Sequence, residues 1–114
     1  MRKILIAEDD LTMVSLLKTL LKLEGFEVVG LDADADIPAE AARELPDVIL
    51  MDVHLGEQSG MDVVASLRKD PEFAQVKIVM TSGMNLRDEC LKQGADHFLL
   101  KPFMPDDLLK ILNN

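Results

Sequence analysis

Acidic, hydroxyl and basic side chains follow or end short apolar runs at four separate places in this sequence. They are, in chain order, Glu8, Asp9 and Asp10, then Asp52, then Thr81, and finally Lys101. Carboxylates that lie close together raise one another's pKa unless a positive charge lies beside them. Carboxylate and water oxygens suit Mg²⁺, or Mn²⁺ in its place. If the fold gathers these residues, we expect a divalent cation site.

Phosphoryl transfer to a carboxylate is the chemistry that this set of residues supports. Asp52 would be the nucleophile, because aspartyl phosphates are an established class of covalent intermediate. The cation, held by Asp9 and Asp52 and through water by Glu8, would neutralise the phosphoryl oxygens from one side. Lys101 would neutralise them from the other side. Thr81 would donate its hydroxyl to a phosphoryl oxygen, and this bond would draw Thr81 inward and start a conformational switch.

An alternation of short apolar runs and amphipathic stretches sets the positions of these residues. Near-continuous hydrophobicity, typical of strands covered on both faces, occurs at residues 4–7, 26–31, 48–51, 76–81 and 98–100. Apolar residues at helical spacing predict helices over residues 11–24, 38–44, 61–69, 86–93 and 106–112. Five βα units in succession predict an α/β fold of three layers, with a doubly wound five-stranded parallel sheet in the middle.

The predicted topology places the candidate residues on one side of the molecule. The carboxyl ends of all strands in a parallel sheet lie at one edge, and ligands bind in the crevice there. Some of these residues have ordinary explanations when taken alone. Asp10 is expected to cap the following helix, and a single Lys101 would be a solvated surface charge. Suitable residue types at four independent strand ends nevertheless favour a common site.

Composition narrows the class of protein further. The 114 residues amount to one domain, so we expect a single domain over residues 1–114. A net charge of −9 repels phosphate backbones and argues against direct nucleic-acid binding. No apolar run is long enough to span a membrane, and residues 4–7 are too few for the centre of a signal peptide. The single cysteine permits no internal disulfide, so we expect a cytoplasmic protein.

Five segments share their sequence pattern, order and spacing with a known family. They read ILIAEDD at residues 4–10, PDVILMD at 46–52, SGMD at 59–62, IVMTS at 78–82 and GADHFLLKPF at 94–103. Together they resemble the receiver domain of response regulators in two-component signalling, and the chemotaxis regulators in particular. The resemblance extends over essentially the whole chain. It implies a flavodoxin-like sheet with the strand order 2-1-3-4-5.

The resemblance assigns roles in phosphorylation and switching. It implies that Asp52 is the phosphorylation site and that Lys101 binds the phosphoryl group, with a cis peptide bond before Pro102. Thr81 would be the switch hydroxyl. Phe98 occupies the position of an aromatic residue that turns inward when this hydroxyl moves.

The resemblance also implies a ligand set for Mg²⁺. Glu8, Asp9 and Asp52 would form the acidic pocket, and the backbone carbonyl of His54 would be a further ligand. One departure lies in the same loop, because Gly56 stands where the family commonly has proline. Glycine has more backbone freedom, so we expect this loop to be somewhat less ordered.

Two interaction surfaces follow from the resemblance. An apolar rim beside the site would dock the phosphodonor, which is a phosphohistidine on a sensor histidine kinase or a histidine phosphotransfer protein. The residues of this rim would be Met13, Leu16, Pro102 and Phe103. The second surface combines the helices at 86–93 and 106–112 with the strand that carries Phe98. It would bind a downstream protein, form a homodimer, or contact an output domain if the natural chain is longer.

Three other functions fit parts of the pattern. A phosphatase with an aspartyl nucleophile would want a second catalytic Asp two residues beyond Asp52, where His54 stands. A flavin-binding protein would want hydroxyls and glycines after the first strand, where Glu8 and Asp9 repel phosphate. A scaffold that works without phosphorylation would not need Asp52 together with Lys101. The leading hypothesis is a phosphoacceptor switch that catalyses only its own phosphorylation and dephosphorylation, and no reaction of an external metabolite.

Overall fold

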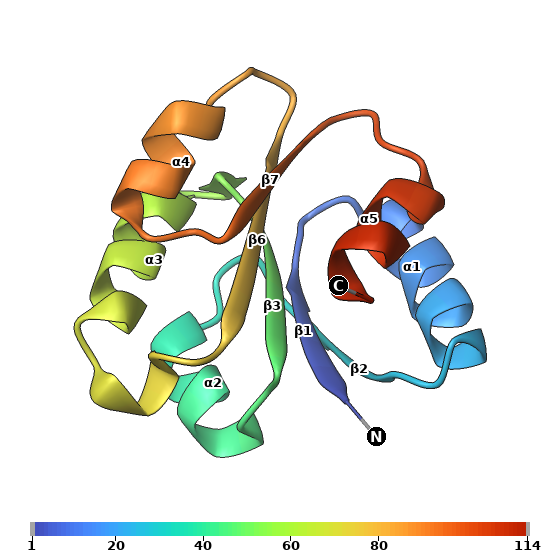
Figure 1. The fold of residues 1–114 in the computed structure, drawn as a ribbon, viewed down its shortest axis with the longest axis horizontal. Helices are drawn as coiled ribbons and strands as arrows, with labels where there is room; N and C mark the ends of the chain where they lie inside the picture. Colours follow the sequence, from blue (N-terminus) through green and yellow to red (C-terminus); the bar gives the residue numbers. More distant parts are fainter. Residues whose placement is uncertain (1, 114) are drawn as a thin grey trace.

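A parallel sheet between two layers of helices forms the structure, a computed structural model that describes residues 2–113 (Figure 1). The strands of this sheet are β1 (Lys3–Ala7), β2 (Glu27–Leu31), β3 (Val48–Asp52), β6 (Lys77–Ser82) and β7 (His97–Leu100). They lie in the order β2-β1-β3-β6-β7, and every neighbouring pair is parallel. The predicted doubly wound five-stranded sheet with the order 2-1-3-4-5 is therefore confirmed.

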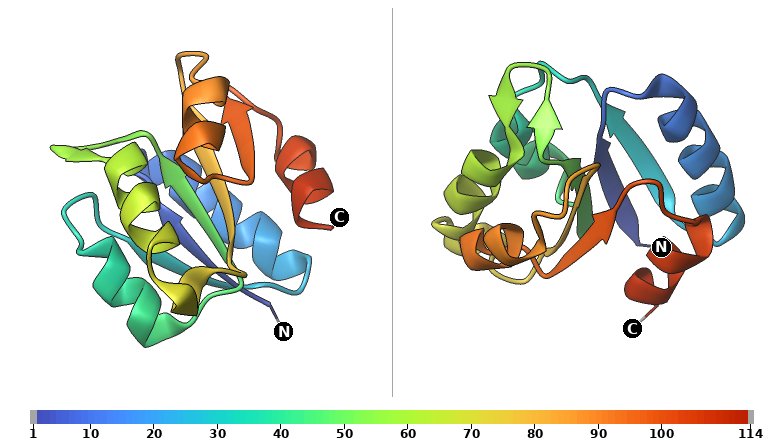
Figure 2. Two further views of the ribbon diagram at one scale, coloured as in Figure 1. Left: turned by 60° about the vertical axis from the view of Figure 1, so that its left-hand side comes forward. Right: turned by 90° about the horizontal axis from the view of Figure 1, so that it is seen from above.

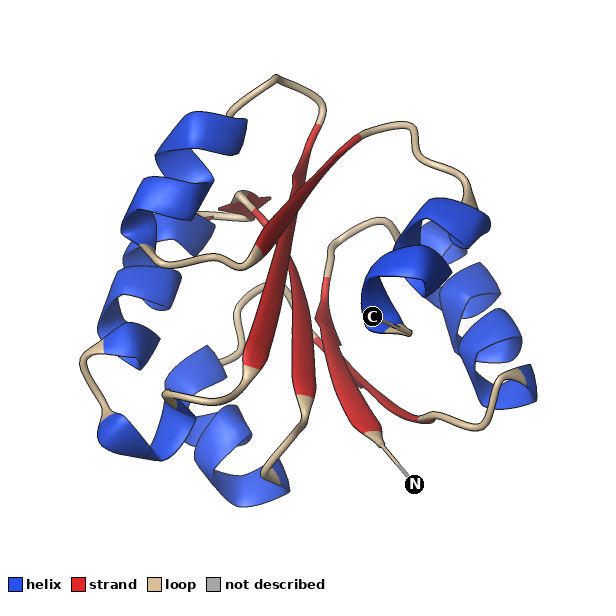
Figure 3. Ribbon diagram, viewed as in Figure 1, coloured by secondary structure: helices blue, strands red, loops and turns tan. Residues whose placement is uncertain are grey.

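Helices cover both faces of the sheet, so the molecule has three layers (Figures 2 and 3). One face carries α1 (Leu11–Leu23) and α5 (Pro105–Leu112). The other face carries α2 (Ile37–Glu44), α3 (Gly60–Arg68) and α4 (Arg87–Gln93). Every predicted end of these helices and of the sheet's strands differs from the observed end by at most one residue. Within residues 2–113, no helix combines the length and the apolar character needed to cross a membrane.

The strands divide their side chains between two cores, one on each face of the sheet. In β1, Leu5 and Ala7 pack in the core that includes α2, α3 and α4, whereas Ile4 and Ile6 pack in the core that includes α1 and α5. This division follows from strand geometry, because successive side chains point to opposite faces. All four side chains are completely buried. The continuous hydrophobicity of the strands is thus explained by burial on both faces.

Polar side chains set the starts of three helices. The Asp10 carboxylate accepts hydrogen bonds from the backbone amides of Thr12 and Met13, so Asp10 caps α1 as expected. Asp36 and Ser59 accept from backbone amides in the first turns of α2 and α3 in the same way. Because Asp10 serves as a cap, the other two acids that follow β1 remain for the predicted site.

The structure contains two short elements that the sequence did not predict. A hairpin of β4 (His54–Leu55) and β5 (Gln58–Ser59) follows β3, and a 3₁₀ helix, η1 (Pro71–Phe73), follows α3. Gly56 is the first residue of the two-residue turn of this hairpin and has a φ of 55°. Glycine at that position is typical of type II′ hairpins, whereas proline is restricted to a φ near −65°. The departure from the family at Gly56 therefore falls in the turn of this hairpin, and the lower order of the loop stays a prediction.

Leu45 is expected to limit stability, because it ends α2 in the left-handed conformation with a φ of 50° and a ψ of 59°. This conformation costs residues other than glycine about 1–2 kcal/mol, and Asn tolerates it better. The Leu45 side chain is 64% exposed and contributes little to the core. Leu45→Asn should therefore raise the free energy of unfolding by about 1 kcal/mol, seen as a higher urea midpoint at unchanged slope. Leu23→Asn, at the exposed end of α1, is the matched control; an equal gain there would contradict the conformational explanation.

Candidate functional site

The carboxyl ends of β1 and β3 bring three acidic side chains together. Glu8 and Asp9 directly follow β1, and Asp52 is the last residue of β3. One carboxylate oxygen from each of these residues lies within 4.8 Å of the other two. Across residues 2–113, this is the only group of at least three His, Cys, Asp or Glu side chains close enough to hold a metal ion. An oxygen-only donor set fits Mg²⁺, which commonly keeps several water ligands.

Lys101 brings a positive charge into contact with this group. Its Nζ atom donates hydrogen bonds to Glu8 Oε2 and to Asp52 Oδ2, each at 2.6 Å. Lys101 reaches this position from the end of β7, and its peptide bond to Pro102 is cis, as expected. Three carboxyl groups therefore face one ammonium group at the edge of the sheet. A divalent cation would offset the remaining negative charge.

Burial and ion pairing have opposite effects on the two partners. Burial raises the pKa of Glu8 above its usual value of 4.5, and hydrogen bonds from Lys101 and from the Asp10 amide lower it without cancelling the rise. Burial lowers the pKa of Lys101, but its hydrogen bonds with Asp52 and Glu8 outweigh burial and leave this pKa raised. Lys101 is therefore protonated. For Glu8, burial disfavours the ionised carboxylate.

Backbone groups hold Asp52 in place at the end of its strand. The His54 amide donates to Asp52 Oδ1 at 3.1 Å, while Lys101 contacts the other carboxylate oxygen. The loop after Asp52 closes on itself, because the Gly60 amide donates to the Val53 carbonyl at 2.6 Å. A Cβ atom on Gly60 would lie 2.3 Å from the Asp52 carbonyl oxygen. Only glycine therefore allows α3 to begin this close to the end of β3.

The two residues expected to form the switch lie on neighbouring strands. Thr81 is 1% exposed in β6 and is the register partner of Asp52. Phe98 lies in β7 opposite Met80, and its ring is 8% exposed in the core beneath α4. The aromatic ring is thus buried in this structure, and Thr81 stands directly beside Asp52.

The residues of the expected apolar rim differ in their exposure. Leu16 is 54% exposed and Pro102 is also exposed, whereas Met13 and Phe103 are half-buried against the core of α1 and α5. The neighbour of Leu16, Leu17, is buried and faces the sheet. Two further apolar side chains in the segments after β1 and β7 are exposed at 77% and 68%: Leu11 and Met104. The exposed part of the rim therefore includes Leu11, which the sequence did not single out.

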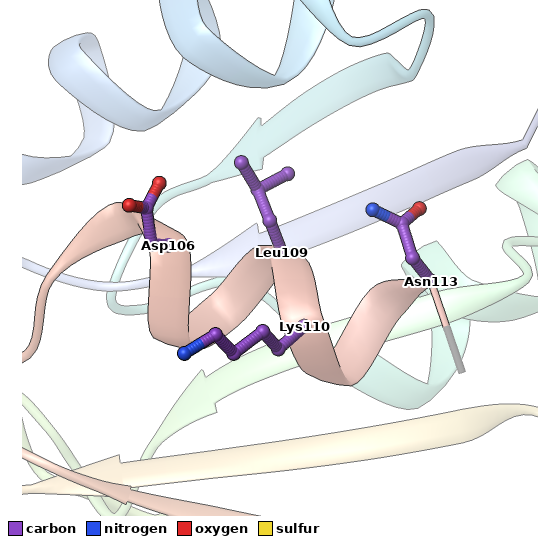
Figure 4. A pocket seen from close by; sticks show the side chains of 4 residues that line it. All are labelled: Asp106, Leu109, Lys110 and Asn113. Carbon is purple, nitrogen blue, oxygen red and sulfur yellow. The ribbon is translucent and has the colours of Figure 1, made fainter.

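A hollow on the surface of α5 shares no residue with the acidic group. It is lined by Asp106, Leu109, Lys110 and Asn113 (Figure 4). Asp106, Leu109 and Asn113 extend to one side of the helix, and Lys110 runs along the helix toward the turn that carries Asp106. Its mixed lining contains a single carboxylate and offers no ligand set for a cation.

Two features of the segment after Asp52 were not recognised in the sequence. Gly60 was expected only as part of a turn, and its close approach to Asp52 depends on how α3 packs against β3. Gln58 donates from Nε2 to the carbonyls of Ala33 at 2.7 Å and Ala35 at 2.9 Å. The dipeptide after Leu55, Gly-Glu, was an available signal for the hairpin. The contacts of Gln58 span more than 20 residues and leave no local signal.

Fold and site together define a receiver domain, and comparison with known proteins agrees. The chain belongs to the response regulator receiver domain family, which matches residues 4–113. It is 32% identical over 117 residues to the chemotaxis protein CheY of Thermotoga maritima, covering 98% of this chain and 95% of that protein.

Solved structures of receivers resemble this one closely. The chemotaxis response regulator CheY4 of Vibrio cholerae has a TM-score of 0.89 at 28% identity, covering 99% of this chain and 97% of that one. The receiver domain of the sensor histidine kinase PA1611 of Pseudomonas aeruginosa has a TM-score of 0.83, also at 28% identity, covering 98% and 94%. That structure contains a magnesium ion coordinated in the active site cleft.

The raised pKa of Glu8 should make one contribution to stability fall with pH. The unfolded chain releases this proton at a lower pH than the folded chain, so the folded state binds more protons between the two pKa values. The free energy of unfolding should therefore decrease as the pH rises from 4.5 through the folded-state pKa of Glu8. Urea unfolding across this range should show the decrease, and Glu8→Gln should remove it.

Glu24→Gln is the matched control for this pH dependence, because Glu24 is exposed at the end of α1. This variant should keep the wild-type profile. A carbon-13 NMR titration of the Glu8 carboxyl in the wild type supplies a direct test. A midpoint at or below 4.5 would contradict the burial argument.

Proposed function

We propose that this chain is a phosphoacceptor switch of a two-component phosphorelay and that Asp52 is its phosphorylation site. The observation that carries the proposal is the setting of the Asp52 carboxylate at the carboxyl edge of the sheet. It lies 2.6 Å from Lys101 Nζ and beside the carboxylates of Glu8 and Asp9. Membership in the receiver family supports the same function. The chain would catalyse only its own phosphorylation and dephosphorylation.

In the proposed reaction, a phosphohistidine of a kinase or phosphotransfer protein donates the phosphoryl group. An oxygen of Asp52 attacks the phosphorus, and the phosphorus–nitrogen bond breaks with its electron pair going to the imidazole. Lys101 then pairs with a phosphoryl oxygen and neutralises part of its charge. Glu8, Asp9, Asp52 and the His54 carbonyl would hold Mg²⁺, which supplies the remaining charge neutralisation when bound.

Phosphorylation would redistribute the contacts of Lys101 and Thr81. Lys101 now divides its hydrogen bonds between Glu8 and Asp52, and a phosphoryl group on Asp52 offers it a new anionic partner. Thr81 is the register partner of Asp52, which supports the proposal that its hydroxyl follows that phosphoryl group. Movement of Thr81 would be passed to Phe98 on the adjacent strand. We propose that the surface of α4, β7 and α5 changes as a result, since both helices contact β7.

The proposed partners follow from the two surfaces. The rim of Met13, Leu16, Pro102 and Phe103 would dock the histidine kinase or phosphotransfer protein. The surface of α4, β7 and α5 would bind a downstream protein, a second copy of the chain, or an output domain if the natural chain is longer. Direct nucleic-acid binding is disfavoured by the net charge of −9. We place this exchange in the cytoplasm, as expected from the single cysteine.

Replacement of the phosphoacceptor tests the proposal directly. An acyl-phosphate donor should add one phosphoryl group to the wild-type chain only when Mg²⁺ is present, as measured by intact mass. Asp52→Asn should lower the yield of this adduct to background, because an amide is not a nucleophile for the phosphorus. Asp88→Asn, at an exposed aspartate of α4, is the control and should be modified like the wild type. An undiminished adduct in Asp52→Asn would place the acceptor at another residue.

Removal of the lysine should separate modification from switching. Lys101→Ala should still take up beryllofluoride with Mg²⁺, but the amide NMR shifts that the wild type shows in α4, β7 and α5 should be absent. The physical reason is that Lys101 is the cation that contacts Asp52. Lys22→Ala, at an exposed lysine of α1, should switch normally. Wild-type shifts in Lys101→Ala would contradict this role, and an unfolded variant would mark the residue as structural.

A further inference from the structure

The hairpin of β4 and β5 forms most of the loop that follows Asp52. The base of this loop is closed by the hydrogen bond from the Gly60 amide to the Val53 carbonyl. Inside it, an antiparallel ladder pairs His54 with Ser59 and Leu55 with Gln58. Two-stranded hairpins have little stability of their own in water. The order of this hairpin therefore depends on how it is attached to the rest of the molecule.

Three side chains attach the hairpin. Leu55 is completely buried in the core of α2, α3 and α4. Ser59 accepts a hydrogen bond from a backbone amide of the first turn of α3. Gln58 reaches the segment between β2 and α2, where its Nε2 atom donates hydrogen bonds to the carbonyls of Ala33 and Ala35. The attachment of the hairpin to this neighbouring segment therefore includes one bridging amide group.

The bridge crosses a hollow on the surface. This hollow is lined by residues of the segment after β2 and of the hairpin, namely Ala33, Asp34, Gly56, Glu57 and Gln58. Asp34 and Glu57 are exposed acidic residues of this lining, so the lining already carries negative charge from both segments. The amide of Gln58 is neutral and supplies two donors, so it can hold the two sides together without adding charge.

The hairpin also carries a group that acts on the phosphoacceptor. The His54 amide, in β4, donates to Asp52 Oδ1 at 3.1 Å. The His54 carbonyl belongs to the ligand set that we propose for Mg²⁺. Any tilt of the hairpin would move both groups relative to Asp52. Outer contacts of this kind commonly decide the affinity of a metal site, because they orient the ligands themselves.

We infer that Gln58 is a positioning residue of the phosphoacceptor site, because its bridge to residues 33–35 holds the hairpin in the orientation that binds the cation beside Asp52. This inference rests on the proposed Mg²⁺-dependent function. It has a further consequence, since residues 33–35 are joined to the same hairpin. Through the Gln58 bridge, cation binding at Asp52 is expected to change the environment of the segment between β2 and α2.

Gln58→Met tests the inference, because it keeps the length and neutrality of the side chain and removes both donors. In amide NMR titrations with Mg²⁺ alone, the dissociation constant should rise about tenfold relative to the wild type. The wild type should show Mg²⁺-dependent shifts at Ala33 and Ala35, and these should disappear in Gln58→Met while shifts at Asp9 persist. Gln75→Met, at an exposed glutamine before β6, is the matched control and should behave like the wild type.

The outcomes separate the two proposals. A wild-type chain whose acids do not respond to Mg²⁺ would overturn the proposed function. A responsive wild type with unchanged affinity and unchanged shifts at residues 33–35 in Gln58→Met would overturn this inference alone, as would an equal loss in Gln75→Met. Urea unfolding checks that Gln58→Met is folded. If it is not, Gly56→Ala disturbs the same hairpin through its φ of 55°, and wild-type affinity in that variant would likewise overturn the inference.

Discussion

The crowding of carboxylates at one edge of the sheet is the constraint on which the rest of this structure depends. Glu8, Asp9 and Asp52 have oxygens within 4.8 Å of one another, which is unfavourable without nearby positive charge. Lys101 supplies one such charge through hydrogen bonds to two of the three carboxylates. Because one ammonium does not balance three carboxyl groups, we propose that the site takes a divalent cation and a phosphoryl group that exchanges contacts with the lysine.

The parallel sheet makes this crowding possible and also rigid. The acids and Lys101 lie at the carboxyl ends of three strands, β1, β3 and β7, and the strands are buried on both faces by α-helices. The chain then adds local supports around Asp52. Gly60 allows α3 to begin against the end of β3, and the hairpin places the His54 amide on the carboxylate. The supports come from the loop after β3, whereas the charges come from the ends of three strands, β1, β3 and β7.

The same arrangement connects the site to the surface. Thr81 lies beside Asp52, and its strand pairs with β7, which carries Phe98 and is contacted by both α4 and α5. The route that we propose for a change in the charge on Asp52 runs through Thr81 and β7 to two helices. The second route that we propose leads through Gln58, which donates hydrogen bonds to Ala33 and Ala35, to the segment between β2 and α2. The two routes leave the site on opposite sides of β3, because β6 and β2 lie on opposite sides of it in the sheet.

The sequence by itself determined the helices and strands and the order of the candidate site residues along the chain. It also determined the edge of the sheet at which these residues gather. Continuous apolar runs required strands buried on both faces, and residues such as Asp52 and Lys101 were placed by the strands that precede them. Tertiary structure alone decided that Leu16 is exposed while Leu17 is buried, that the Phe98 ring lies in the core, and that Gln58 bridges to Ala33 and Ala35. The reason is physical: periodicity and strand ends are local properties of the chain. The direction of one side chain and a contact across more than 20 residues depend on how whole elements pack.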